Sequence, residues 1–188
     1  MSDQTIFALS SASGKAGIAI IRISGARALD TLTRVTGLKS PAARFAHRIK
    51  VREVKTKEIV DDGLALYFPA PKSFTGEDVV ELHLHGSRAV LDETTSLLCE
   101  DNNIRLAEPG EFTKRAFQNG KINLLKAESI ADLVSSETEI QRKQALKIMS
   151  GKSSDKFNSW REKLLKILSH IEAKIDFPDE DLPKDILS

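Results

Sequence analysis

The sequence predicts a mixed α/β domain, with a mixed sheet and flanking helices, followed by an all-α arm. Two runs of alternating residues, Ile18 to Ile23 and Val79 to His85, predict strands with one buried face. Later in the chain, apolar residues recur at helical spacing instead. We therefore expect a first domain over residues 1–118, the first helices of a second domain over 119–178 and a disordered tail over 179–188.

The composition is that of a protein that buries an ordinary core and stays soluble. Hydrophobic residues make up 40% and charged residues 29%, and 28 Lys and Arg nearly balance 27 Asp and Glu. This balance gives no bulk attraction to nucleic acid or acidic membranes, and no apolar run approaches the roughly 20 residues that span a bilayer. Cys99 is the single cysteine, which argues against a disulfide framework and fits a cytoplasmic location.

The first strands of the sheet are expected at Thr5–Leu9 and Ile18–Ile23. Arg22 is a charge on an otherwise apolar strand, which indicates either an edge position with the guanidinium reaching water or a cation aimed at an anionic ligand. Both interpretations stay open on the sequence. Ser24 is placed to cap a short helix that ends before Gly37.

Two further strands, Arg44–Val54 and Gly63–Phe68, are expected around a charged turn. The segment from 55 to 62 has the pattern of a solvated hairpin turn, with Asp62-Gly63 as its turn signal. These residues therefore predict a β-hairpin at one side of the sheet.

The stretch from Ser73 to Gly86 is the centre of the predicted domain. Its strand is expected to send three apolar side chains to the core face and four side chains to the other face: Val80, Leu82 and Leu84 against Val79, Glu81, His83 and His85. Ser87 is placed to cap the helix that follows, which extends to about Asp101. A short strand is then expected at Ile104–Ala107 and a helix at Glu111–Gln118.

The arm is expected to consist of helices that each carry one apolar stripe. Ser136 with Glu139 fits a capping box for the second of them, and Gly151 should end it. A third helix carries apolar residues at helical spacing: Phe157, Trp160, Leu164, Ile167, Leu168, Ile171 and Ile175. Such helices do not close a core easily, so the arm needs the first domain, a second copy of the chain or further sequence to pack against.

Glu81, His83 and His85 alternate along one strand face, which is one way in which proteins hold zinc. No third His or Cys is placed by local spacing, so we predict no metal. The sequence also lacks a G-x-S-x-G nucleophile elbow and a G-x-x-x-x-G-K-[ST] P-loop, to which Gly14-Lys15 is only a partial match. We therefore predict no catalytic residue and no GTP binding in this stretch.

Glu81 fits two further roles. A carboxylate beside an apolar pocket accepts two hydrogen bonds from an amide N–H and an adjacent amine, which is the donor pair of pterins and guanines. A carboxylate on a strand face also forms ion pairs with a neighbouring Arg or Lys. Both roles stay open on the residues alone.

Five motifs occur in the order found in one protein family. They are IIRISG (20–25), FTGEDVVEL (74–82) with His85-Gly86 after it, PGEFTKRAF (109–117), AESIADL (127–133) and IDFPDE (175–180). On these motifs, nearly the whole chain resembles the N-terminal portion of the tRNA-modification GTPase family MnmE, also called TrmE.

The resemblance implies a domain like the tetrahydrofolate-binding domain of the glycine-cleavage T-protein, and a homodimer. It implies 5-formyl-tetrahydrofolate as the ligand, with Arg22, Glu81 and Lys121 at the positions of the family's folate contacts. It also implies a GTPase domain and a C-terminal cysteine motif that these 188 residues do not contain. GTP, Mg and K would belong to that part. The partners would be the flavin-dependent MnmG (GidA) subunit and tRNA, whose wobble uridine is modified.

Two other functions fit the same sequence. One is a stand-alone folate-dependent aminomethyltransferase-like protein, and the other is a pure oligomerisation module without ligand. Binding of 5-formyl-tetrahydrofolate would separate a folate protein from a module that only assembles.

Overall fold

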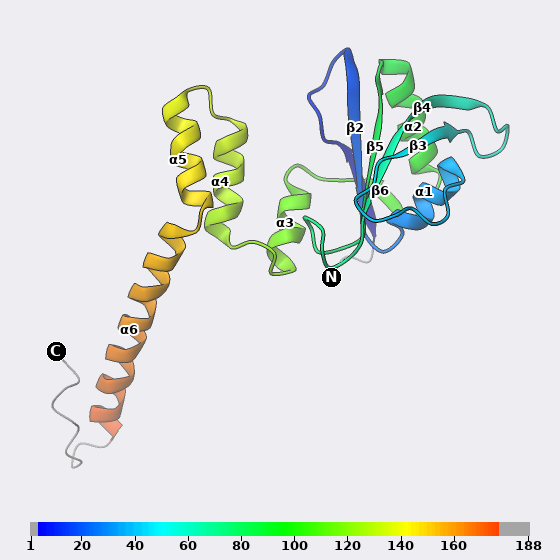
Figure 1. Cartoon of the computed structure of the whole chain (residues 1–188). Helices are drawn as coiled ribbons and strands as arrows, with labels where there is room; N and C mark the ends of the chain where they lie inside the picture. The colour runs from blue at the N-terminus through cyan, green and yellow to red at the C-terminus, as the bar shows by residue number, and fades with distance from the viewer. Residues whose placement is uncertain (1–3, 177–188) are drawn as a thin grey trace. The chain divides into compact units, whose positions relative to one another are not determined.

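The computed structural model describes residues 4–176 and divides into two compact units, Met1–Ile122 and Asn123–Ser188 (Figure 1). The division lies four residues after the boundary expected between 118 and 119. The segment behind that boundary bonds to the first unit, because Asn119 Nδ2 donates to the carbonyl oxygen of Thr75 and Lys121 Nζ donates to that of Pro71. The tail expected to be disordered, 179–188, lies outside the described residues.

The first unit is built on a six-stranded mixed sheet with the strand order β3-β4-β5-β2-β1-β6. The β1–β6 pair is parallel and the other neighbouring strands are antiparallel. The strands are β1 (Thr5–Leu9), β2 (Ala16–Ser24), β3 (His47–Arg52), β4 (Ile59–Phe68), β5 (Val79–Gly86) and β6 (Ile104–Leu106). The helices of this unit are α1 (Ala28–Thr36), α2 (Arg88–Cys99) and α3 (Glu111–Gln118). The predicted fold class, a mixed sheet with flanking helices followed by a helical region, is confirmed.

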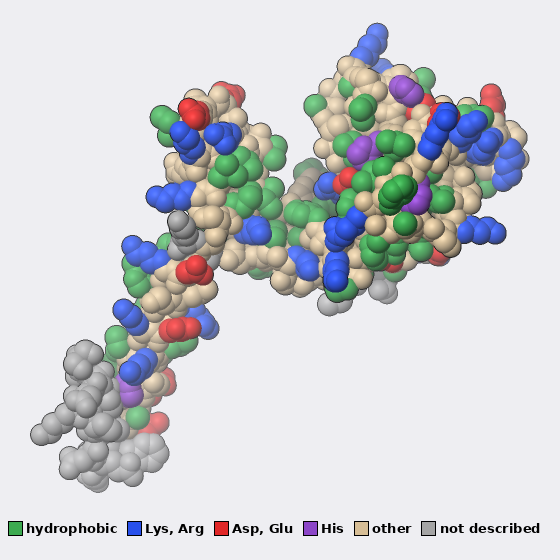
Figure 2. Space-filling model, in the orientation of Figure 1, with side chains coloured by type: hydrophobic (Ala, Val, Ile, Leu, Met, Phe, Trp, Pro, Cys, Tyr) green, Lys and Arg blue, Asp and Glu red, His purple; other side chains and the backbone are tan. Residues whose placement is uncertain are grey.

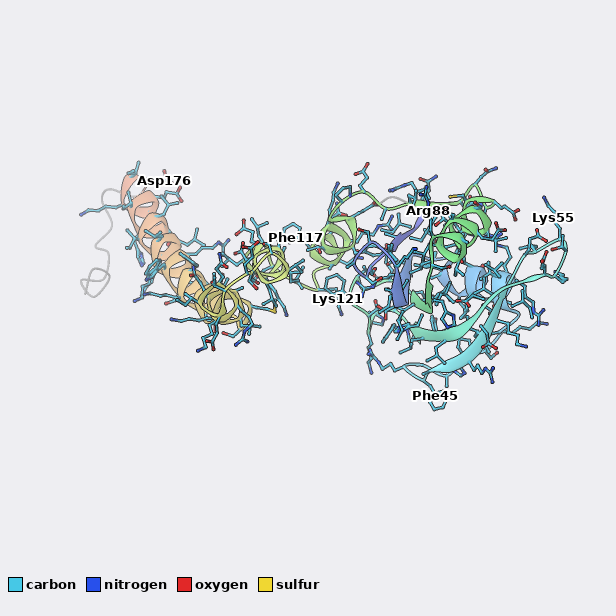
Figure 3. The ribbon with its side chains drawn as sticks, turned by 90° about the horizontal axis from the view of Figure 1, so that it is seen from above. Phe45, Lys55, Arg88, Phe117, Lys121 and Asp176 are labelled. Carbon is cyan, nitrogen blue, oxygen red and sulfur yellow. The ribbon has the colours of Figure 1, made fainter. Side chains whose placement is uncertain are left out.

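The core lies on one face of the sheet, under α1 and α2. Alternation along the central strands buries Ala19, Ile21 and Ile23 of β2 and Val80, Leu82 and Leu84 of β5, as the sequence predicted. Contacts of α1 with β3 and β5, and of α2 with β4 and β5, cover this face. Figure 3 looks along the sheet and shows both helices on the same side of β3 and β4. The opposite face mixes charged and apolar side chains, such as Glu81 and His83 beside Ile20 and Leu66, and these residues are only partly buried.

Two local predictions in the first unit were wrong. Ser24 does not cap α1; it ends β2, and its hydroxyl bonds to Thr75 Oγ1 and Glu77 Oε2, each at 2.7 Å. The hairpin turn is also earlier than expected, because Asp62 and Gly63 lie inside β4, opposite Lys50 and Ile49 of β3.

The second unit contains α4 (Leu124–Val134), α5 (Glu139–Met149) and α6 (Lys152–Asp176). Helices α4 and α5 pack against each other, and the capping box of α5 is formed by Thr138 and Gln141 rather than by Ser136 and Glu139. Along α6, the apolar residues named above are exposed to solvent in the described chain. Within residues 4–176, no helix is both long and apolar enough to cross a membrane.

Candidate functional site

Arg22 and Glu81 lie directly opposite each other on the neighbouring strands β2 and β5. The Arg22 Nε and Nη2 atoms donate to Glu81 Oε1 at 2.9 and 2.7 Å, so a single carboxylate oxygen takes both bonds. The Arg22 side chain is 29% exposed and that of Glu81 is 16% exposed. Because β2 lies between β5 and β1, the edge-strand interpretation of Arg22 is excluded. The ion pair that the sequence left open for Glu81 is present.

Two phenylalanines flank the guanidinium of Arg22. Its central carbon lies 5.8 Å from the ring centre of Phe74, in the loop before β5, and 5.7 Å from that of Phe112, in α3. An aromatic face attracts a cation at this distance and also excludes water from it. The ion pair therefore sits beside apolar surface, where hydrogen bonds to a charged group are stronger than in bulk water.

Lys121 is connected to this pair through the loop between Phe68 and Val79. The Lys121 Nζ atom donates to the carbonyl oxygen of Pro71 at 2.8 Å. Its aliphatic stem lies against Gly76, where an added Cβ would be 3.2 Å from the Lys121 Cγ and Cδ atoms. Gly76 also has a φ of 81°, so a larger residue there would be strained as well as crowded. Arg22 and Glu81 are thus in direct contact. Lys121, which follows α3 in the chain, packs against the loop that carries Phe74.

The two histidines of β5 face different carboxylates. The His83 Nε2 atom lies 3.5 Å from Glu81 Oε2, longer than a normal hydrogen bond, and is buried without a hydrogen-bond partner in the described part of the chain. The His85 Nδ1 atom lies 2.8 Å from Asp61 Oδ1, and the His85 backbone N–H donates to the other oxygen of Asp61. Among residues 4–176, no group of three or more His, Cys, Asp or Glu side chains is arranged to hold a metal ion. Figure 2 shows histidine side chains among hydrophobic and basic ones on this unit.

A buried ionic network fixes the start of α3 beside the site. The Glu111 carboxylate accepts hydrogen bonds from Arg105 at 2.7 and 2.8 Å, from Arg115 at 3.2 Å and from the Glu108 backbone at 2.9 Å. Arg115 also donates to both oxygens of Glu77, in the loop that carries Phe74. Hydrogen bonding by Arg105 is the main cause that lowers the pKa of Glu111 to about 2. The network therefore holds α3, with Phe112, against that loop.

The sequence reading missed Phe74, Phe112 and the members of this network. The spacing of Glu111 and Arg115, four residues apart on one helix, is a signal that could have suggested their pairing. The other contacts join residues far apart in the chain, such as Glu77 and Arg115, and no local sequence pattern predicts them.

Comparisons with known proteins define the class of this chain. Residues 5–121 match the family model described as the GTP-binding protein TrmE N-terminus, and residues 124–187 match the MnmE helical domain. The mixed sheet with its loop and α3 is thus a TrmE-type N-terminal domain, followed by a helical region of the MnmE type.

The chain belongs to the MnmE (TrmE) family. Curated relatives carry the name tRNA modification GTPase MnmE. One from Pelagibacter ubique (strain HTCC1062) is 61% identical over 183 residues, which cover 97% of this chain and 41% of the relative. Those from Rickettsia rickettsii (strain Sheila Smith) and Parvibaculum lavamentivorans are 52% and 49% identical, over 98% of this chain and 42% of each relative. The chain therefore spans about two fifths of the length of these relatives.

Proposed function

We propose that the first unit binds a reduced folate, 5-formyl-tetrahydrofolate, with Glu81, Arg22 and Lys121 as its polar contacts. The observation that carries the proposal is the state of the Glu81 carboxylate. Arg22 takes up Oε1, whereas Oε2 accepts no hydrogen bond from the described residues, although the side chain is mostly buried. Among the described residues Oε2 is not one of the buried atoms that lack a partner, so it is open to solvent, and a ligand can bring a donor to this charged acceptor.

The surroundings of this acceptor suit a flat heterocycle. Ile20 and Leu66, the strand neighbours of His83 and Glu81, supply partly buried apolar surface. The ring of Phe74, which is 37% exposed, lies beside Arg22. Small-molecule sites usually combine apolar walls with a few convergent polar groups. A pterin presents an N–H and an adjacent amine to a carboxylate, and Arg22 and Lys121 are available for its polar or carboxylate groups.

Isothermal titration with 5-formyl-tetrahydrofolate tests this proposal. We expect saturable binding to the wild-type chain and about 3- to 10-fold weaker binding to Lys121→Ala, since an exposed charged hydrogen bond contributes modestly. Lys114→Ala is the matched control, because Lys114 belongs to α3 and lines, with Glu108 and Gln118, a concavity whose lining includes none of Arg22, Glu81 and Lys121. Absence of binding to the wild type would refute the folate proposal and favour a module that only assembles.

We also propose that the chain forms a homodimer, as the family resemblance implies. The partly exposed apolar residues of the open sheet face and of α6 supply surface that a second copy could bury. Sedimentation velocity should show a species of twice the 20.7 kDa chain mass that grows with protein concentration. A single species of the chain mass at every concentration would exclude this role.

For the whole protein we propose the activity that the relatives' name states, GTP hydrolysis in tRNA modification. In this proposal the folate supplies carbon, and a flavin-dependent MnmG subunit helps to install an aminomethyl-type group at C5 of the wobble uridine in the cytoplasm. The 188 residues contain no P-loop sequence, so we assign GTP, Mg and K to the whole protein rather than to this stretch. A GTPase assay of the full-length protein with and without potassium chloride tests this assignment.

A further inference from the structure

His83 lies in the middle of the open sheet face, between Ile20 of β2 and Leu64 of β4. Its side chain is 26% exposed, but its Nε2 atom is buried and has no hydrogen-bond partner among the described residues. This atom lies 3.5 Å from Glu81 Oε2. A buried ring nitrogen so close to a carboxylate oxygen, yet without a hydrogen bond to it, needs a physical explanation.

A proton added to the ring would change this contact. A neutral imidazole with its proton on Nδ1 turns the Nε2 lone pair toward the carboxylate, and no hydrogen bond forms. A protonated imidazolium carries N–H groups at both nitrogens and would close the 3.5 Å gap to a charge-assisted hydrogen bond. Since Arg22 already bonds to Oε1, a proton on His83 would reduce the part of Oε2 that is left for another donor.

We propose that His83 is a positioning residue that controls access to Glu81 Oε2. This inference rests on the proposed folate binding at the same carboxylate. Neutral His83 leaves both lone pairs of Oε2 to donors of the reduced folate, whereas protonated His83 takes one of them and neutralises part of the carboxylate charge. Proton binding to His83 and folate binding to Glu81 are therefore mutually unfavourable, and each weakens the other by the same factor.

Lys50 of β3 lies opposite Asp62, and the other charged groups around His83 have ion-pair partners of their own among the described residues. On β5, His85 is paired with Asp61; on β2, the diagonal neighbour Arg22 is paired with Glu81. On β4 and β3, Asp62 and Arg48 form a bidentate pair with distances of 3.0 and 2.8 Å. Glu81 Oε2 is thus the carboxylate oxygen that a protonated His83 meets first.

The sign of the pH dependence distinguishes this mechanism from simple attraction. A folate carries a glutamate tail with negative charge, so a new positive charge on the protein would tighten binding if only long-range attraction acted. Competition for Oε2 predicts the reverse: binding weakens as the pH is lowered from 8 to 6.

Titration calorimetry with 5-formyl-tetrahydrofolate at pH 8, 7 and 6 tests the proposal. We expect the wild-type dissociation constant to rise about 3- to 10-fold from pH 8 to pH 6. In His83→Leu, whose new side chain packs between Ile20 and Leu64, this dependence should vanish. His83→Gln, which cannot gain a proton, should behave in the same way and covers the case in which the leucine variant does not fold. His85→Gln is the matched control and should keep the wild-type profile.

The outcomes separate this inference from the proposed function. Binding that is independent of pH in the wild type, or a pH dependence that persists in both His83 variants, would overturn the role of His83 and leave folate binding intact. No binding by the wild type at any pH would overturn folate binding, and the role of His83 with it.

Discussion

Replacement of Glu81 by glutamine is expected to weaken the binding of 5-formyl-tetrahydrofolate by about 10- to 100-fold. In the wild type, one oxygen of the carboxylate holds Arg22 and the other is left for the ligand. A glutamine of the same shape keeps one acceptor and turns an amide donor toward either Arg22 or the ligand. One charge-assisted hydrogen bond is therefore lost and replaced by a contact between two donors. Calorimetric titration of both chains at pH 8 measures the change.

Asp62→Asn is the matched control for this substitution. Asp62 also forms a cross-strand pair with an arginine, Arg48, but the pair is more exposed and belongs to the β3–β4 side of the sheet. Asp62→Asn removes one negative charge and leaves Glu81 unchanged, so the affinity for 5-formyl-tetrahydrofolate should stay within about twofold of the wild type. A thermal melt of each variant checks that the domain is folded. A Glu81→Gln chain that binds folate as tightly as the wild type would remove Glu81 from the site.

Replacement of Glu111 by glutamine is expected to lower the free energy of unfolding of the first unit by about 3 kcal/mol at pH 7. The Glu111 and Arg115 side chains are only 9% and 6% exposed, so the substitution removes a buried negative charge that Arg115 shares with Glu77 and that Arg105 pairs with directly. The hydrogen bonds from Arg105 lower the pKa of Glu111 to about 2, from an ordinary value near 4.5. Urea unfolding monitored by circular dichroism measures the difference.

The sign of the pH dependence follows from this shift. Because the folded pKa lies below the unfolded one, the stabilisation is present above about pH 4.5 and is lost as the pH falls toward 2. The gap between wild type and Glu111→Gln should therefore narrow in acid. Asp92→Asn, which breaks an exposed pair with Arg88 in the same unit, should change stability by less than about 0.5 kcal/mol. Equal stability of the wild type and Glu111→Gln at pH 7 would show that the network does not hold α3.

Much of the fold was predictable because its strands alternate clearly. Ala19, Ile21 and Ile23 of β2 and Val80, Leu82 and Leu84 of β5 matched the buried face of the sheet, whereas Val79, expected on the polar face, is also buried. Helix α3 has the bounds predicted from its flanking Gly and Asn residues. Local signals failed where two of them compete. Ser136 with Glu139 and Thr138 with Gln141 both fit a capping box, and the sequence does not show which pair starts the helix.

The hairpin shows the same limit. Asp62-Gly63 is the usual turn signal, yet the chain turns earlier, where Lys57 adopts a positive φ of 65°. Gly63 is instead required inside β4, because an added Cβ would lie 2.3 Å from the carbonyl oxygen of His83 on β5. A close approach between strands is a tertiary property, and the sequence reading did not contain it.

The site was only partly predictable from the sequence, because it too depends on contacts between distant strands. Alternation placed Glu81 and His83 on one face, and the family resemblance added Arg22 and Lys121 as contacts. Strand order then decided what Arg22 meets, since β2 pairs with β5 across 59 residues of sequence. Phe74 and Phe112 lie over the Arg22 guanidinium because of the conformation of the loop before β5 and the ionic network around Glu111. Sequence periodicity predicts neither of these features.

A crystal structure of this chain with 5-formyl-tetrahydrofolate tests the central claim most directly. We expect the pterin ring to lie against Phe74 with its N–H and amine donors about 3 Å from the Glu81 carboxylate. A ligand found elsewhere, for example in the 580 Å³ concavity lined by Glu108, Lys114 and Gln118, would contradict this assignment.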